Sequence, residues 1–282
     1  MYERHLKIVE LVRIQEYVSV ERLAQYFGVT MQTIRRDINK LNEDGLLTRH
    51  HGGAGLPTSV GNSNYKTRKN LLLRSKIKIA RTLAKHIPNG SSLFINIGTT
   101  TEETAKSLLN KKNLTVITNN INVAMILCEN ETAEIVLAGG VVRKIDKGIT
   151  GEATIDFIKQ FKVDYGIIGI SGIDSDGTLL DFDYNEVRVA RTIIKNARKV
   201  FLVADHSKFK RNATVCLCHI SEVNAFFTDE NPSPEIAKIL SASGVDLFVA
   251  EQEKPGSEEG QEGRSCDIAI FCEIAISQLR YI

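Results

Sequence analysis

The sequence lacks the features that mark secreted, zinc-binding and membrane-spanning proteins. Its five cysteines are an odd number, and they are scattered apart from Cys216 and Cys218. No pair of CxxC motifs is present, so we expect no metal site. The absence of a signal peptide and of any apolar run of about 18 residues favours a reducing cytoplasm and no membrane partner.

Bulk charge excludes little, because the net charge is +2 over 282 residues. Residues 1–58 carry basic and acidic side chains in nearly equal number, so any nucleic-acid contact there needs a local arrangement of charge. From Leu56 to Thr101 every charged residue is basic. That run is either a solvated linker and helix face or a contact region for phosphate groups. The length suits two domains of about 100–200 residues.

The first sixty residues follow the pattern of a helix-turn-helix. Apolar residues recur at helical spacing over 2–16, and Ser19 is placed to cap a second helix. Gly28 ends that helix after two turns, and Thr30 can cap a third helix over 31–44. Two short helices joined by a three-residue turn that contains glycine are typical of this motif.

The third helix has two unlike faces. An apolar stripe that we expect to be buried consists of Met31, Ile34, Ile38 and Leu41. The remaining surface offers side chains that bind base edges or phosphates, namely Gln32, Thr33, Arg35, Arg36, Asn39 and Lys40. Asp37 is the single acid between Thr30 and Lys40 and lies on a flank. We therefore interpret this helix as a recognition helix.

A short extended stretch follows Gly45 and leads into Gly52 and Gly53, as in a wing. Arg49 and His50 are then placed to reach the DNA backbone or minor groove. A metal site at the adjacent histidines lacks further ligands, so contact with phosphate or solvent is favoured. The predicted DNA-binding residues are Ser19, Thr30, Gln32, Thr33, Arg35, Arg36, Asn39, Lys40, Arg49 and His50. We expect a winged helix-turn-helix over 1–58 and a linker over 59–74.

Strands and helices alternate from Ile77 onward. Strand-like runs are expected at 92–96, 114–118, 134–138, 165–170, 200–204, 225–228 and 246–250. Helices are expected at about 75–86, 101–110, 120–128, 154–161, 185–197 and 234–243. Apolar strands separated by helices predict a mainly parallel, doubly wound α/β sheet over 75–250. Ligands of such sheets bind beyond the carboxyl ends of the strands.

Several strand ends carry residues suited to a phosphorylated ligand. After the first strand, Gly98 leads into three threonines, whose hydroxyls and helix-start N–H groups form a cradle for phosphate; a capped turn is the alternative. Asn amides bond sugar hydroxyls, and paired glycines admit a ligand to the backbone. The predicted effector-binding residues are Gly98, Thr99, Thr100, Thr101, Asn119, Gly139, Gly140, Arg143 and Lys208. A catalytic triad at Asp205, His206 and Ser207 is rejected, because neighbours in sequence rarely have triad geometry.

These motifs together resemble the DeoR family of bacterial sugar-metabolism regulators. In the N-terminal part the likeness is carried by residues 32–37 (QTIRRD), 45–47 (GLL) and 51–54 (HGGA). In the C-terminal part it is carried by residues 98–101 (GTTT), 118–120 (TNN), 139–140 (GG), 169–173 (GISGI) and 205–209 (DHSKF). The resemblance covers about residues 1–250, and the combination of motifs is specific.

The resemblance implies a homo-oligomeric repressor, dimer or tetramer, that binds double-stranded operator DNA. It also implies a Rossmann-like sensor domain similar to ribose-5-phosphate isomerase, with residues 98–101 on the phosphate and Lys208 near the ligand. A closer likeness at 92–102, 151–158 and 180–184 implies glycerol-3-phosphate as the effector and operators of glycerol-uptake genes. No cofactor is expected.

Three alternatives to this reading stay open at this point. The chain regulates another sugar-phosphate pathway, or it binds DNA better with ligand, since sequence cannot fix the sign of coupling. An isomerase-like enzyme needs a carboxylate base, for which Asp181 or Glu186 beside Lys208 are candidates, but an enzyme does not need the helix-turn-helix.

Residues 251–282 form an extension of unknown role, with a polar stretch over 251–264 that is typical of a linker. The apolar end either docks or is an unordered tail from an altered reading frame.

Overall fold

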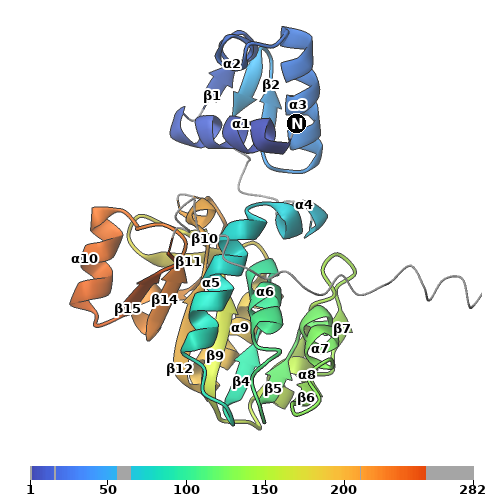
Figure 1. Ribbon diagram of the computed structural model, residues 1–282, viewed down its shortest axis with the longest axis vertical. Helices are drawn as coiled ribbons and strands as arrows, with labels where there is room; N and C mark the ends of the chain where they lie inside the picture. The colour runs from blue at the N-terminus through green and yellow to red at the C-terminus, as the bar shows by residue number, and fades with distance from the viewer. Residues whose placement is uncertain (1, 16, 56–64, 210, 252–282) are drawn as a thin grey trace, which may run out of the picture. The chain divides into compact units, whose positions relative to one another are not determined.

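The computed structural model describes residues 2–15, 17–55, 65–209 and 211–251 (Figure 1). The expected extension over 251–282 lies outside these residues, except for Glu251. Within the described ranges, no helix is both long and apolar enough to cross a membrane.

The N-terminal residues form a winged helix-turn-helix, as predicted. The elements are α1 (Tyr2–Gln15), β1 (Tyr17–Ser19), α2 (Val20–Phe27), α3 (Met31–Glu43), β2 (Thr48–His50) and β3 (Gly53–Gly55). Strand β3 pairs antiparallel with both β1 and β2. The sequence did not predict β1, because three residues are too few for a periodic pattern. The wing is therefore a three-stranded sheet.

The predicted caps of the two motif helices are confirmed. The Ser19 hydroxyl accepts a hydrogen bond from the Arg22 N–H at 3.2 Å, and the Thr30 hydroxyl accepts one from the Thr33 N–H at 3.2 Å. Gly28 ends α2 with a left-handed φ of 62°, a conformation that favours glycine. These three residues fix the turn that orients α3.

The apolar stripe of α3 is buried from its second turn onward. Ile34, Ile38 and Leu41 are at most 1% exposed and pack in the core of the domain. Met31 is 45% exposed, so its predicted burial is wrong. The helical wheel assumed contact along the whole helix, but on α3 the core begins only at Ile34.

The C-terminal region is a seven-stranded parallel sheet in the order β15-β14-β12-β9-β4-β5-β6. Its strands are β4 (Ser92–Ile95), β5 (Thr115–Thr118), β6 (Glu134–Leu137), β9 (Val163–Gly169), β12 (Ala197–Val203), β14 (Ala225–Thr228) and β15 (Asp246–Val249). Its main helices are α5 (Leu73–Lys85), α6 (Thr99–Ser107), α7 (Ile121–Leu127), α8 (Glu152–Ile158), α9 (Tyr184–Asn196) and α10 (Pro234–Ala242). All neighbouring strands of this sheet run parallel, which confirms the predicted doubly wound fold.

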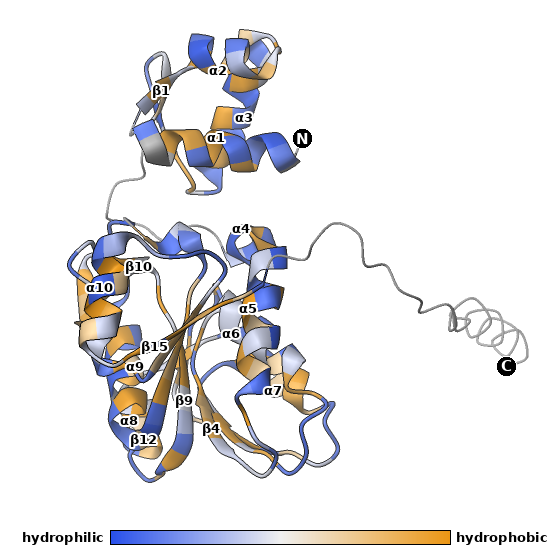
Figure 2. Ribbon diagram, turned by 60° about the vertical axis from the view of Figure 1, so that its left-hand side comes forward, coloured by the Kyte–Doolittle hydropathy of each residue, from blue (hydrophilic) through white to orange (hydrophobic). Residues whose placement is uncertain are grey.

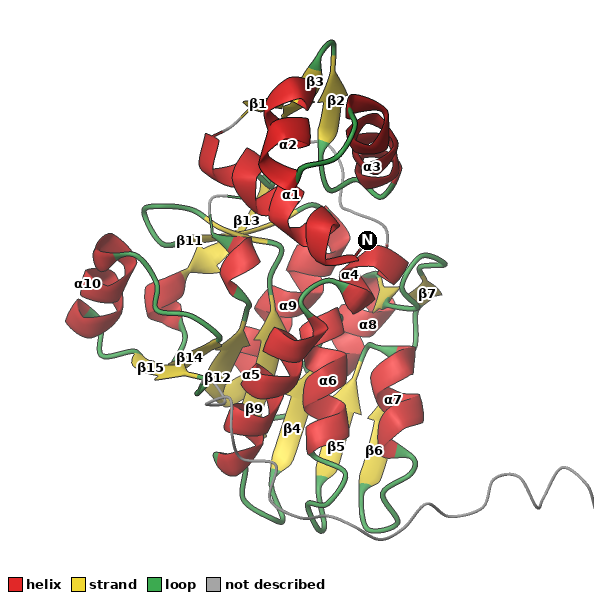
Figure 3. Ribbon diagram, turned by 45° about the horizontal axis from the view of Figure 1, so that its top comes forward, coloured by secondary structure: helices red, strands yellow, loops and turns green. Residues whose placement is uncertain are grey.

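Helices cover both faces of this sheet (Figure 3). Successive strand residues point to opposite faces, so Leu93 and Ile95 pack under α5, α6 and α7 while Phe94 packs with α8, α9 and α10. Apolar residues line the strands between the two helix layers (Figure 2). Burial on both sides explains why these strands read as continuous apolar runs in the sequence.

Several short elements were not predicted. They are α4 (Tyr65–Asn70), the hairpin β7 (Val141–Val142) and β8 (Ile149–Thr150), a small antiparallel sheet of β10 (Gly172–Ile173), β11 (Thr178–Asp181) and β13 (Val215–His219), and the 3₁₀ turns η1 (His206–Lys208) and η2 (Ile220–Glu222). Helix α4 lies in the segment expected to be a linker. Leu72 joins α4 to α5 with a left-handed φ of 52°.

The chain order along the sheet reverses between β4 and β9. From β4 the chain adds β5 and β6 outward on one side, and from β9 it adds β12, β14 and β15 on the other. The loops at the carboxyl ends of two such strands diverge to opposite faces, which leaves a place for a ligand. The end of β4 leads directly into residues 98–101.

Candidate DNA-binding surface and effector site

Helix α3 presents its predicted contact residues to solvent. Gln32, Arg35, Arg36 and Lys40 are exposed, while Thr33 and Asn39 are half-buried. Long basic and amide side chains on one exposed helix face are suited to phosphates and base edges in a major groove. The structure is therefore compatible with the predicted role of these residues, which stays a prediction.

The one acid on this part of α3 is removed from that surface. Asp37 is 5% exposed, and its carboxylate accepts hydrogen bonds from Arg4 Nε at 2.7 Å and pairs with His5 Nε2 at 3.0 Å. Burial alone would raise the pKa of Asp37, but the hydrogen bonds from Arg4 and His5 outweigh it and hold the pKa below its ordinary value. The sequence placed Asp37 on a flank and missed both partners, which come from α1. The charge of Asp37 is thus balanced inside the domain.

The wing is fixed to α3 by two asparagines. Arg49 Nη1 donates to Asn39 Oδ1 at 2.8 Å, and the Arg49 backbone N–H donates to Asn42 Oδ1 at 2.9 Å. A groove of about 380 Å³ runs between α3 and the wing, lined by Val20, Arg35, Ile38, Arg49, His50, His51, Gly52 and Gly53. Asn42 was missed because its role is to hold the wing. Ser19 and Thr30, predicted as DNA contacts, act here as helix caps.

We expect Asp37→Asn to destabilise the DNA-binding domain by about 1–3 kcal/mol, because it weakens a buried carboxylate bonded to Arg4 and His5. Urea unfolding followed by far-UV circular dichroism measures this loss. Asp44→Asn is the matched control, since Asp44 pairs with Lys40 at the surface at 3.4 Å. Its expected effect is below about 0.5 kcal/mol. Equal effects of the two variants would contradict a structural role for Asp37.

The predicted phosphate cradle, residues 98–101, occupies the start of α6 at the switch point of the sheet. Asn96 Oδ1 accepts a hydrogen bond from the Gly169 N–H at 3.0 Å, which links the ends of β4 and β9. The Thr101 hydroxyl donates to the carbonyls of Asn96 at 2.9 Å and Gly98 at 2.8 Å, so it shapes the loop. The first N–H groups of a helix have no partner within the helix and attract anions. The cradle therefore offers backbone donors more than the Thr101 side chain.

The predicted effector-binding residues Asn119, Gly139 and Gly140 lie at the ends of β5 and β6, beside the β7/β8 hairpin. Asn119 Nδ2 donates to the Ile149 carbonyl at 2.9 Å, while buried Asn119 Oδ1 has no hydrogen-bond partner among the described residues. A side chain on Gly140 would lie 2.2 Å from the hydroxyl of Thr154. Close packing against α8 thus explains why residue 140 is a glycine. At Gly139 a side chain would meet only open space, so packing gives no reason for that glycine.

Arg143 is held by three carboxylates. Its guanidinium donates to Asp146 at 2.6 and 2.9 Å, to Asp183 at 3.0 Å and to Glu186 at 2.6 Å. Burial would lower the pKa of Arg143, but the charges and hydrogen bonds of Glu186 and Asp146 raise it. Burial and the nearby charge of Asp181 raise the pKa of Glu186 to about 8, although Arg143 opposes this. The sequence treated Arg143 as an available ligand and missed the carboxylates, which are up to 43 residues away.

Two lysines and an aspartate lie near the end of β12. Burial lowers the pKa of Lys208 to about 7 and that of Lys76 to about 8, while the charge of Asp205 raises both. Burial would raise the pKa of Asp205, which is 1% exposed, but the two lysines lower it. An anion that reached this group would raise the pKa of Lys208. Lys76 was not predicted, because burial of a lysine cannot be read from its neighbours in sequence.

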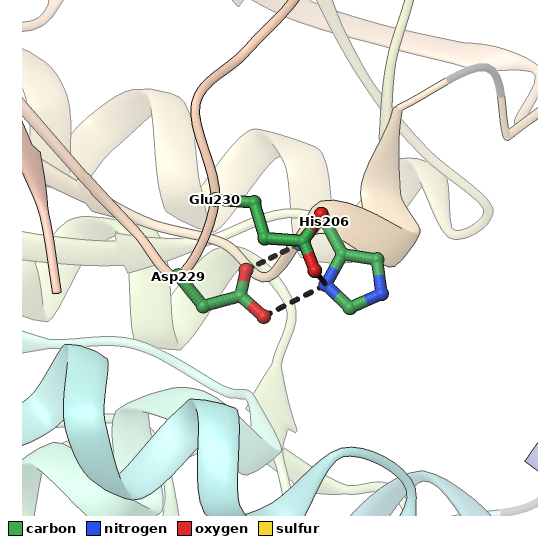
Figure 4. A group of neighbouring side chains, drawn as sticks. All are labelled: His206, Asp229 and Glu230. Carbon is green, nitrogen blue, oxygen red and sulfur yellow. Dashed lines mark hydrogen bonds and ion pairs between the residues drawn. The ribbon is translucent and has the colours of Figure 1, made fainter. Parts of the chain in front are cut away.

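His206 joins η1 to the end of β14 (Figure 4). Its Nδ1 lies 2.7 Å from Asp229 Oδ2 and 3.3 Å from Glu230 Oε1, and its backbone N–H donates to Asp229 Oδ1 at 2.7 Å. The bond to Asp229 raises the pKa of His206, despite its burial. These contacts hold the start of η1 against the end of β14, and Lys208 follows His206 by two residues.

Comparisons with known proteins identify the family of both domains. Residues 4–60 match the model of a DeoR-like helix-turn-helix domain, and residues 73–230 match that of the DeoR C terminal sensor domain. The chain is 54% identical over 245 residues to the glycerol-3-phosphate regulon repressor of Escherichia coli, covering 87% of this chain and 97% of the relative. It is 40% identical to the HTH-type transcriptional repressor CsqR of the same organism, over 89% of this chain and 96% of that one. Among solved structures it is similar to ribose 5 phosphate isomerase A from Neisseria gonorrhoeae, with 13% identity, a TM-score of 0.36 and coverage of 48% and 52%.

Proposed function

The chain belongs to the DeoR family of transcriptional regulators, and from this premise we propose that it represses genes of glycerol-3-phosphate utilisation. In this proposal α3 and the wing bind operator DNA, and a small phosphorylated metabolite releases them. The observation that carries it is a close relative that is a glycerol-3-phosphate regulon repressor and matches this chain over 87% of its length.

Glycerol-3-phosphate suits the candidate effector site. Its phosphate would accept hydrogen bonds from the N–H groups of the cradle and pair with the Lys208 ammonium. Its hydroxyls would donate to buried Asn119 Oδ1, the acceptor without a partner among the described residues. Arg143 then acts indirectly, by holding the hairpin against α9. Other sugar phosphates share the phosphate contact and differ in the hydroxyl contacts.

The two candidate carboxylates, Asp181 and Glu186, are not free to act as catalytic bases. A proton-transferring enzyme needs a carboxylate free to act as base near the substrate. Glu186 is bound to Arg143 at 2.6 Å, and Asp181 is buried and bonded to the backbone N–H of Phe182 at 2.7 Å. Relatives at 54% and 40% identity are repressors.

A repressor that reads two half-sites also needs a symmetric homo-oligomer, dimer or tetramer, in the cytoplasm with the DNA.

The test is a fluorescence-anisotropy titration of the full chain on DNA from upstream of its own operon. We expect binding that glycerol-3-phosphate weakens about 5–150-fold, the usual range of allosteric coupling. Glycerol and fructose-1-phosphate serve as controls and are expected to have no effect. Binding that ignores glycerol-3-phosphate would remove it as the effector, and absence of any binding would contradict the repressor itself.

A further inference from the structure

Helix α4 lies on the end of α6 that carries the cradle (Figure 1). The Tyr65 hydroxyl donates to the two carboxylate oxygens of Glu102, at 2.8 and 3.1 Å. Asn122 Nδ2 at the start of α7 donates to the same hydroxyl at 3.1 Å and to Glu102 Oε1 at 3.0 Å. Glu102 directly follows the cradle and is 2% exposed. The first anchor of α4 is thus one residue from the predicted phosphate position.

Lys76 forms a second anchor. It lies in α5 and is 2% exposed, and its ammonium donates to the carbonyls of Arg68 and Leu71 at the end of α4, the latter at 2.6 Å. An ammonium at the carboxyl end of a helix neutralises its dipole and caps its free carbonyls. The same ammonium lies close enough to Glu102 and Glu103 for their charges to act on it. One cation therefore serves both α4 and the first turn of α6.

A third contact joins α4 to the hairpin loop. Arg68 Nη2 lies 3.5 Å from Asp146 Oδ2, and Asp146 also binds Arg143. The three anchors thus attach α4 to α6, α7, α5 and the hairpin, and each of these borders the candidate effector site. On its other side, α4 follows residues 56–64, which connect it in sequence to β3 of the DNA-binding domain.

We propose that α4 carries effector occupancy from the sensor to the DNA-binding domain, with Tyr65 and Lys76 as positioning residues. The inference rests on the proposed function. A phosphate on the cradle adds negative charge beside Glu102 and attracts the Lys76 ammonium away from the α4 carbonyls. Both effects weaken the docking of α4. In the effector-free state α4 is docked on the sensor. Effector binding favours the state in which α4 is released.

Hydrogen exchange on the full chain, with and without glycerol-3-phosphate, tests this directly. We expect the effector to slow exchange of the amides at 98–101 and to speed exchange at the end of α4, where the Leu71 N–H donates to the Thr67 carbonyl at 2.8 Å. Slower exchange at 98–101 with no change in α4 would overturn the inference and leave the proposed function standing. No change at 98–101 would overturn both.

Tyr65→Phe gives a second test that needs no loss of folding. It removes the Tyr65 donor to Glu102, while Asn122 still donates to that carboxylate. The docked state of α4 is therefore weakened relative to the released state, and the fold of the sensor is kept. We expect effector affinity to rise by about 10- to 150-fold, as for the loss of one hydrogen bond to a charged group. Exchange in α4 should also be faster before effector is added. The matched control is Tyr184→Phe, at a tyrosine that is 65% exposed, with no change expected. Unchanged or weaker effector affinity in Tyr65→Phe would contradict the proposal.

Discussion

Arg36→Ala is expected to weaken operator binding by about 30-fold or more and to leave the response to effector intact. The guanidinium is exposed on α3, on the face from which Asp37 is withdrawn. One contact to a base edge or phosphate contributes about 1–3 kcal/mol, and a dimer loses two of them. Anisotropy titrations on operator DNA at fixed salt measure the loss.

Arg198→Ala provides the matched control for Arg36→Ala. Arg198 is an exposed arginine on β12 that pairs with Asp164 at 3.7 Å, so its removal should not change DNA affinity. The logarithm of affinity against the logarithm of salt concentration should also have a shallower slope for Arg36→Ala, since fewer counterions are released. Equal losses in the two variants, or loss of the effector response in Arg36→Ala, would show that α3 is not the reading helix.

The combined change Thr100→Val and Lys208→Ala should abolish release while operator binding stays within about twofold of wild type. The first change removes a hydroxyl from the cradle, where Thr100 is 5% exposed. The second removes the lysine whose charge acts most strongly on Asp205. Loss of a charged contact and a neutral one together predicts effector affinity lower by about 100-fold. Isothermal titration calorimetry with glycerol-3-phosphate measures that affinity.

Lys159→Ala is the control for the sensor variant. Its ammonium pairs with Asp156 within α8 at 2.9 Å on the surface. We expect effector binding and release to match wild type in this control. If the sensor variant lost operator binding and kept effector affinity, while Arg36→Ala did the reverse, the assignment of the two sites would be wrong.

The strands and helices of the large sheet could be predicted from the sequence, because each of these elements has a strong local pattern. Buried parallel strands give apolar runs such as 114–118, and their helices have capping residues and one apolar face. Every strand of the large sheet was predicted, with boundaries shifted by a few residues. The pairs β7/β8 and β10/β11 were missed, because two to four residues carry no measurable alternation.

The candidate site was predicted in outline, and its charged partners were not. Residues 98–101 stand out as a strand followed by glycine and a helix start. Asp37 and Arg4 are 33 residues apart, and Arg143 and Glu186 are 43 apart. Such pairs form only when the fold brings their elements together, so no spacing in the sequence reveals them. The engagement of Arg143 and the burial of Lys76 therefore needed the structure.

The turn at Leu72 bears on how much metabolite a cell must accumulate before its genes respond. A leucine in the left-handed conformation costs about 1–2 kcal/mol relative to an unstrained backbone. In the proposed mechanism, this turn is held while Lys76 binds the carbonyls at the end of α4, and Leu72 can relax when α4 is released. The strain at Leu72 thus reduces the free-energy difference between the docked and released states by about 1–2 kcal/mol. The effector concentration for half-release is lower by about 5- to 30-fold than an unstrained turn would give.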